Sequence, residues 1–187
     1  MRQGVVTPAD VRELGLAPEN LNKLARLGKL EHIGHGLYRN PDFPVTEHHS
    51  FVEVAKAVPQ GVICLLSALR IHGVGTQMPR EVWVAIPRGK RVPVLRQTAL
   101  RPVTMTETSY KLGVDTRMYE GVAVRVYSLA KTIVDCFRLR RFVGHDTALE
   151  ALRDSIQDRK VSVSEILELA GQLRSRKVID PYVEALL

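Results

Sequence analysis

Residues 7–39 read TPADVRELGLAPENLNKLARLGKLEHIGHGLYR, and this stretch decides the fold of the N-terminal part of the chain. Thr7 is a typical N-cap, and the proline that follows it suits the first helical position because its missing N–H would be unpaired there anyway. A helix is therefore predicted from Pro8 to Leu14, with Gly15 ending it. Pro18 then begins a second predicted helix, so two short helices are joined by a tight turn.

The second helix carries leucines at helical spacing, which are expected to face inward: Leu21, Leu24 and Leu27. Gly28 stops this helix. Residues 30–33 and 37–39 then flank the turn Gly34-His35-Gly36, which predicts a two-stranded wing. A helix-turn-helix followed by a wing is a common device for reading DNA, with the second helix in the major groove.

The polar side chains of this segment suit that use. Asparagine pairs with adenine, arginine with guanine, and lysine neutralises phosphate. The candidate DNA-binding residues are Asn20, Asn22, Lys23, Arg26 and Lys29 on or after the second helix, with His35 and Arg39 on the wing. Two other interpretations stay open, namely an ordinary solvated helix surface and a winged helix that docks a protein.

A winged helix usually has a further helix before this pair, whereas only residues 1–6 precede it here. Three explanations are compatible with this: a start lying upstream, a trimmed domain, or a partner that covers the gap.

Composition sets broad limits on the chain. Its 187 residues, 45% hydrophobic, suffice for one large or two small globular domains. It contains neither a run of eighteen apolar residues nor an N-terminal signal-peptide pattern, so a cytoplasmic protein without membrane partners is expected. Cys64 and Cys136 lie in apolar runs, which favours core positions over a disulfide or a metal site.

The net charge of +7 points toward a polyanionic partner. Residues 1–44 hold six Lys and Arg against five Asp and Glu, so the remaining residues carry +6 of that excess. Further nucleic-acid contacts are therefore expected from two basic clusters outside the helix-turn-helix: Arg88, Lys90, Arg91 and Arg96, near Arg80 and Arg101, and Arg138, Arg140 and Arg141.

The turn-rich connector at residues 40–44 predicts a boundary between a winged helix-turn-helix domain (1–44) and a second domain (45–187). The second domain should be α+β, with a central sheet and a helical C-terminal third. The strands expected are 81–86, 100–105, 117–119 and 122–127. The helices expected are 50–58 behind a Ser50–Glu53 capping box, most of 62–72, 128–139, 146–158, one after a Ser162–Glu165 capping box, and 181–187.

The sequence supports an enzymatic function less well than it supports DNA binding. Glu81 begins a predicted strand but is followed by a basic loop without a second carboxylate, which argues against a metal nuclease. His48 and His49 are neighbours without a supporting ligand, so polar positions at a helix start are favoured over metal binding. Ser128 and Lys131 fit Ser-X-X-Lys spacing, yet an N-cap serine and a lysine that pairs with Asp135 explain them equally well. We expect no enzyme, metal or cofactor, and keep a Ser128–Lys131 hydrolase as a minor alternative.

Five segments in order resemble the AbiEi-type antitoxins and transcriptional regulators of bacterial type IV toxin–antitoxin systems: GLAPENLNKLARLGKLEHIGHGLYR, TEHHSFVEVAKAVPQGVICLLSALRIHG, EVWVAIPRG, EGVAVRVYSLAKTIVDCFRLR and ALEALRDSI. The likeness covers nearly the whole chain, and SLAKT at residues 128–132 is its most distinctive piece. The resemblance implies that the winged helix represses the chain's own operon by binding operator DNA. It also implies that the second domain opposes a nucleotidyltransferase-like toxin without a stable complex. The alternative is a protein-interaction module that does not read DNA.

Overall fold

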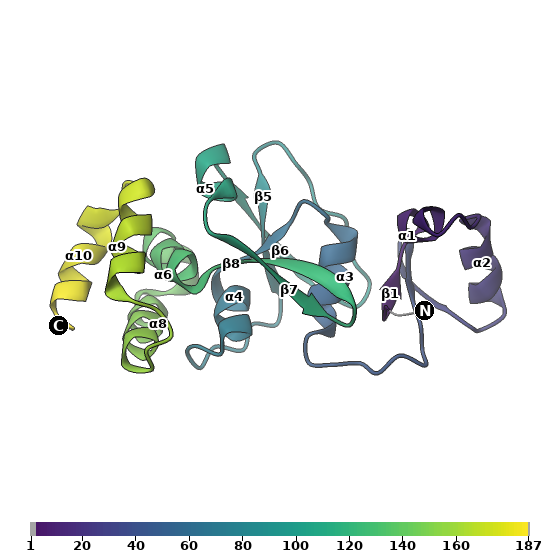
Figure 1. Cartoon of the computed structure of the whole chain (residues 1–187), viewed down its shortest axis with the longest axis horizontal. Coiled ribbons are helices and arrows are strands. Elements are labelled where there is room, and N and C mark those ends of the chain that lie inside the picture. The colour runs from purple at the N-terminus through teal and green to yellow at the C-terminus, as the bar shows by residue number, and fades with distance from the viewer. Residues whose placement is uncertain (1–2, 187) are drawn as a thin grey trace.

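The computed structural model describes residues 3–186 and arranges them as three parts in a row (Figure 1). A winged helix lies at one end, a mixed sheet with its helices lies in the middle, and a group of helices lies at the other end. The α+β class predicted from the sequence, with a helical C-terminal third, is confirmed.

The winged helix consists of β1 (Val5–Val6), α1 (Pro8–Glu13), α2 (Glu19–Arg26), β2 (Glu31–Gly34) and β3 (Leu37–Arg39). Its strands form an antiparallel sheet in the order β1-β3-β2. Thr7 begins α1 as predicted, because its hydroxyl accepts from the Asp10 amide at 3.3 Å while the Asp10 carboxylate accepts from the Thr7 amide at 2.7 Å. The two helices and the wing are confirmed, whereas β1 was not predicted.

One of the three leucines expected to face inward does not. Leu21 is buried and Leu24 is half-buried, but Leu27 is 63% exposed. The physical reason is that each step of three residues drifts by about 60° around a helix, so Leu27 lies about 120° away from the buried Leu21.

The middle part is built around a sheet with the strand order β6-β5-β4-β8-β7. Its elements, in chain order, are α3 (His49–Ala57), β4 (Val62–Ile63), α4 (Leu65–His72), β5 (Val82–Pro87), β6 (Leu100–Met105), α5 (Glu107–Lys111), β7 (Val114–Tyr119) and β8 (Val122–Tyr127). The pairs β5–β6 and β4–β8 are parallel, and the other pairs are antiparallel. The strands predicted at 81–86, 100–105 and 122–127 are confirmed to within one residue, whereas the strand expected at 117–119 begins earlier, at Val114.

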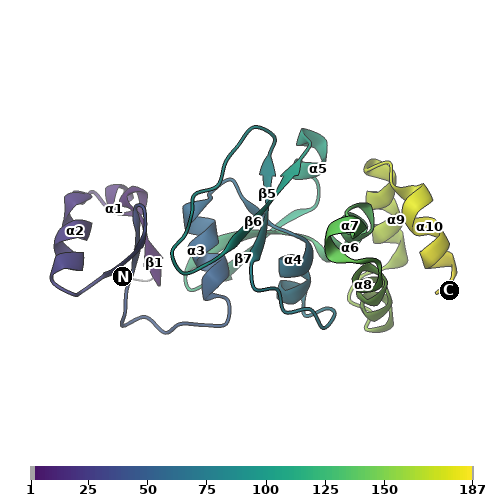
Figure 2. The ribbon, with the colours of Figure 1, turned by 180° about the vertical axis from the view of Figure 1, so that it is seen from behind.

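Helix α3 joins the winged helix to the middle part (Figure 2). One hydrophobic cluster contains Phe51 of α3, Val84 and Val124 of the larger sheet, and Ile33 and Leu37 of the wing. The core therefore continues from the larger sheet through α3 into the wing.

The C-terminal helices are α6 (Leu129–Arg138), α7 (Arg140–Val143), α8 (His145–Gln157), α9 (Val163–Gln172) and α10 (Arg176–Glu184). Helix α6 is the buried centre of this group and packs against α4, α8, α9 and α10. Its cluster includes Cys64 and Cys136, so both cysteines are core residues, as predicted.

Three of the helix predictions differ from the structure. Helix α3 begins at His49 without a side-chain cap, because Glu53, the expected capping-box partner of Ser50, is buried and accepts a hydrogen bond from Thr98 instead. Residues 62–63 form a strand rather than helix, since they pair with both β5 and β8. Helix α10 begins at Arg176 and contains Pro181, and Ile179 and Val183 bury its inner face.

Within residues 3–186, no helix combines the length and the apolar character that crossing a membrane requires.

Candidate nucleic-acid interface

The outer face of α2 carries exposed polar and charged side chains. With about 100° of rotation per residue, Lys23 and Arg26 lie on the side opposite the buried Leu21, and Asn22 lies beside them. Neither Lys23 nor Arg26 forms an ion pair within residues 3–186. Lys29 follows the helix and is also exposed. This face therefore presents cations that are free to meet a polyanion.

Asn20 does not share that face. The same rotation places it on the side of α2 that looks toward α1, where it lines an apolar groove. The sequence grouped Asn20 with Asn22, but the structure separates the two side chains.

Asn22 is held by the wing. The Tyr38 hydroxyl donates a hydrogen bond of 2.7 Å to Asn22 Oδ1, and Tyr38 itself is buried in the small core of the winged helix. This bond engages the acceptor of the Asn22 amide, and the exposed side chain keeps its N–H groups available for a partner. The same bond fixes α2 to β3.

The two candidate DNA-binding residues of the wing differ in how accessible their side chains are. His35 lies exposed in the turn between β2 and β3. Arg39 is half-buried and forms an ion pair with Glu31 on the neighbouring strand, with Nη2 and Oε2 2.8 Å apart. His35 is therefore the more accessible of the two wing residues.

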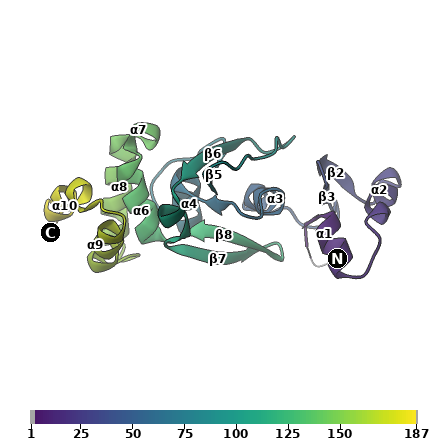
Figure 3. The same ribbon diagram turned by 90° about the horizontal axis from the view of Figure 1, so that it is seen from above.

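The basic loop between β5 and β6 lies beside the wing (Figure 3). Leu95 of this loop packs against the cluster that contains Ile33 and Leu37, and a Cβ added at Gly34 would lie 3.7 Å from Leu95 Cδ2. The four cations that the sequence singled out in this loop are all exposed: Arg88, Lys90, Arg91 and Arg96. The loop that carries these cations thus packs on the wing, although the two segments are far apart in the sequence.

The second basic cluster lies near α7, toward the end of the molecule opposite the winged helix (Figure 3). Arg138 is occupied, because its Nη1 contacts Asp135 Oδ1 at 2.7 Å and Ser109 Oγ at 2.9 Å. Arg140 donates to the Phe137 carbonyl, and Arg141 stacks on Phe142. The structure therefore does not bring this cluster together with α2.

Comparison with known proteins adds a family for the first part of the chain. Residues 1–41 match the family model described as "Transcriptional regulator, AbiEi antitoxin". The similarity to this family thus covers 41 of the 187 residues and concerns the winged helix. The match ends before α3, so the likeness of the later segments to this family stays a prediction.

The fold of the whole chain is similar to the crystal structure of the RV2827C protein from Mycobacterium tuberculosis. The TM-score is 0.59 at 17% sequence identity, and the alignment covers 100% of this chain and 76% of that chain. No curated protein matched the sequence.

A polar cluster joins α3 to the turn between β7 and β8, beside the winged helix. His49 Nδ1 lies 2.7 Å from Glu120 Oε2, and its Nε2 lies 3.5 Å from Glu53 Oε1. Glu53 and Glu120 raise the pKa of His49, because both carboxylates favour the charged ring. The Gly4 amide also donates to the Glu120 carbonyl, at 3.3 Å. Sequence reasoning treated His49 only as a helix-start residue and missed this long-range partnership.

A fully buried ion pair lies inside α6. Lys131 Nζ hydrogen-bonds to Asp135, as the spacing predicted, and lies 4.1 Å from the centre of the Tyr127 ring. Burial lowers the pKa of Lys131. Ser128 uses its hydroxyl to cap α6, accepting from the Lys131 amide at 3.3 Å. Lys131 is thus sealed in the core with another partner, which removes the basis for a Ser128–Lys131 hydrolase.

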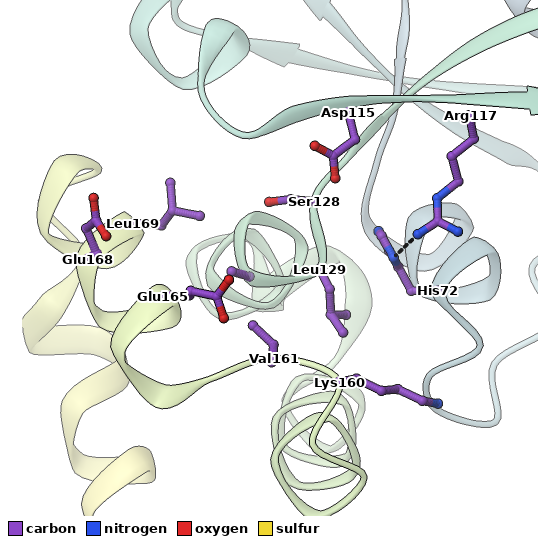
Figure 4. A pocket seen from close by; sticks show the side chains of 11 residues that line it. His72, Asp115, Arg117, Ser128, Leu129, Lys160, Val161, Glu165, Glu168 and Leu169 are labelled. Atoms are coloured by element: carbon purple, nitrogen blue, oxygen red, sulfur yellow. Dashed lines mark hydrogen bonds between the residues drawn. The ribbon is translucent and has the colours of Figure 1, made fainter.

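Ser128 also lines a cavity of about 520 Å³ between β7, the start of α6, and α9 (Figure 4). His72 has both ring nitrogens engaged there, because Nε2 donates to the Tyr127 carbonyl at 2.8 Å and Nδ1 accepts from Arg117 at 3.2 Å. Burial lowers the pKa of His72, so the ring is neutral and already hydrogen-bonded. His72 is therefore not free to activate Ser128. The remaining charged lining is mixed in sign: Asp115, Lys160, Glu165 and Glu168.

Proposed function

We propose that the chain is a DNA-binding autorepressor and the antitoxin of a bacterial type IV toxin–antitoxin pair, acting in the cytoplasm. The observation that carries the proposal is the free cationic face of α2, a helix that is bonded to the wing on which the basic loop packs. The AbiEi family of residues 1–41 supports the same assignment, since it is a family of transcriptional regulators and antitoxins.

In this proposal α2 enters the major groove of operator DNA. Arg26 meets a guanine edge, Lys23 and Lys29 neutralise phosphates, and the Asn22 amide donates to a base. Asn20, on the side of α2 toward α1, is proposed to contact only the edge of the site. The Asn22–Tyr38 bond supports this role, because it orients the reading helix on the wing before DNA arrives.

The wing and the basic loop are proposed to hold the DNA backbone. His35 and the four cations of the 88–96 loop face a phosphate run beside the groove, with Arg39 supporting the wing. This explains how a nearly neutral helix-turn-helix (residues 1–44) gains affinity, because the second domain (45–187) adds its charge at the wing. The cluster at Arg138, Arg140 and Arg141 is proposed as a separate surface for nucleic acid.

The antitoxin role is proposed for the second domain. Its functional partner would be a nucleotidyltransferase-like toxin encoded nearby, opposed without a stable complex, a cofactor or catalysis by this chain. Co-expression tests it: the neighbouring reading frame alone should stop growth, and this chain should restore growth. A neighbouring frame that is harmless alone contradicts the antitoxin role.

DNA binding is tested by fluorescence anisotropy with the DNA upstream of the chain's own gene. Lys23→Ala with Arg26→Ala should weaken binding, and the slope of log affinity against log salt should fall by about 0.9 for each lost phosphate contact. Arg153→Ala is the matched control, because Arg153 is an exposed cation on α8, far from α2. Equal effects of the control and the α2 variants contradict the proposal.

The alternative function is a winged helix that docks a protein. The near neutrality of residues 1–44 and the apolar groove beside α1 favour it. Salt dependence separates the two functions, because DNA binding collapses with rising salt whereas apolar docking does not.

A further inference from the structure

The winged helix has an uncovered apolar groove between α1 and α2. The cavity measures about 410 Å³, and its floor consists of Val6, Val11 and Leu21. Leu14, Leu16 and Leu24 form its sides, and Glu13 lies at its rim. The groove opens on the side of α2 that carries Asn20, away from Lys23 and Arg26.

Exposed leucines surround this groove. Leu14 is 70% exposed and Leu16 is 54% exposed, and both project from the turn that joins α1 to α2. Leu27, at the end of α2, lies about 20° from Asn20 by helical rotation and thus on the same side. A group of large exposed apolar side chains around a groove indicates an interaction surface, whereas single exposed apolar residues are common on any protein surface.

The groove also brings the small core of the winged helix close to solvent. The cluster inside the winged helix has five buried residues, Val6, Val11, Leu21, Leu30 and Tyr38. Three of these five form the groove floor, so water reaches close to the centre of this small core. An occupant of the groove would remove that apolar surface from water and stabilise the part of the molecule that has least core of its own.

We propose that the occupant is a second copy of this chain. Leu14 and Leu16 project from this surface, and the groove lies beside them. Each copy can therefore insert its leucines into the groove of the other. A two-fold contact of this kind needs a surface that complements itself. Charge meets this need as well, because Glu13 lines the groove and its neighbour Arg12 is exposed beside it, and neither forms an ion pair within residues 3–186.

The dimer leaves the outer face of α2 free on both copies. A two-fold pair of winged helices matches an operator with two half-sites, and this consequence rests on the proposed function. The dimer itself does not depend on DNA binding. It assigns Asn20 to the rim of the contact between copies.

Sedimentation equilibrium of the full chain without DNA tests the inference. The chain should form dimers in the micromolar range, and Leu14→Glu should raise the dissociation constant at least about tenfold, as expected for a buried interface anchor. Leu14 is exposed in the single copy, so this variant should fold. Met78→Glu is the matched control, since Met78 is 76% exposed but lies outside the groove, between α4 and β5.

A charge reversal tests the two-fold arrangement. Arg12→Glu alone and Glu13→Arg alone should each weaken the dimer, and the double variant should restore it, because Arg12 of one copy meets Glu13 of the other. A chain that stays monomeric overturns the inference, as does equal weakening by Leu14→Glu and Met78→Glu, or a double variant weaker than both single ones.

The DNA experiment keeps the two proposals separate. A chain that dimerises through the groove but ignores operator DNA supports this inference and contradicts the proposed function. A chain that binds operator DNA but stays monomeric in sedimentation overturns this inference and leaves the proposed function standing.

Discussion

The buried pair in α6 gives the sharpest prediction for stability. Lys131 and Asp135 are both fully buried, and the Asp135 carboxylate accepts from Lys131 Nζ and from Arg138 Nη1. Asp135→Ala removes the partner of a buried ammonium group. Breaking such a pair costs about 3–5 kcal/mol of the free energy of unfolding.

The upper end of this loss of about 3–5 kcal/mol follows from the protonation of Lys131. A lysine left without a partner in the core gives up its proton, and at pH 7 neutralising a group with pKa near 10.4 costs about 4.6 kcal/mol. The loss of stability also depends on pH. The unfolded variant then binds one proton more than the folded variant, so its stability should rise by about 1.4 kcal/mol per pH unit relative to the native chain.

Denaturant unfolding at pH 7, 8 and 9 measures both quantities. Lys131→Met combined with Asp135→Leu should recover most of the stability, because apolar replacement of a whole buried pair is often neutral or stabilising. Lys111→Ala, which breaks the exposed Lys111–Glu107 pair, is the control and should change little. A loss below about 1 kcal/mol for Asp135→Ala, or a loss independent of pH, would refute the reasoning.

Three further predictions concern other contacts. His49→Gln should cost most stability below about pH 6.5, and the cost should fade as pH rises through the raised pKa of His49; urea unfolding across pH checks this, and a cost that grows with pH contradicts it. Gly113→Ala should cost about 2–4 kcal/mol, because φ is +61° and the new Cβ would lie 2.8 Å from Lys131 Cβ. Gly89→Ala, with positive φ but open space, should cost less in the same thermal melt, and equal losses would contradict the clash. Tyr38→Phe should cost about 1 kcal/mol in denaturant unfolding through its lost hydrogen bond, and no loss contradicts that contact.

Local signals in the sequence were enough for much of the fold. The Thr7 N-cap and the glycine turn at 34–36 each act within a few residues, so the helix and the strands beside them were predicted well. Leu27 was predicted wrongly because a repeated spacing of three residues drifts away from the buried face by about 60° per step.

Long-range contacts explain what the sequence could not predict. Residues 62–63 are strand because β5 and β8 flank them, and Glu53 leaves its expected cap because Thr98 lies beside it in space. The candidate interface has the same limit. The exposed face of α2 follows from helical spacing, whereas the placing of the 88–96 loop on the wing depends on Leu95 packing near Gly34, some sixty residues away in the chain.

The central claim is that α2 reads operator DNA. The most direct measurement is the affinity of the Lys23→Ala, Arg26→Ala double variant for the DNA upstream of the chain's own gene, at fixed salt. Loss of the Arg26 base contact should cost about 1–3 kcal/mol, and loss of the Lys23 phosphate contact should weaken binding to all sequences alike. Operator affinity equal to that of the native chain, with the variant folded, would contradict the claim.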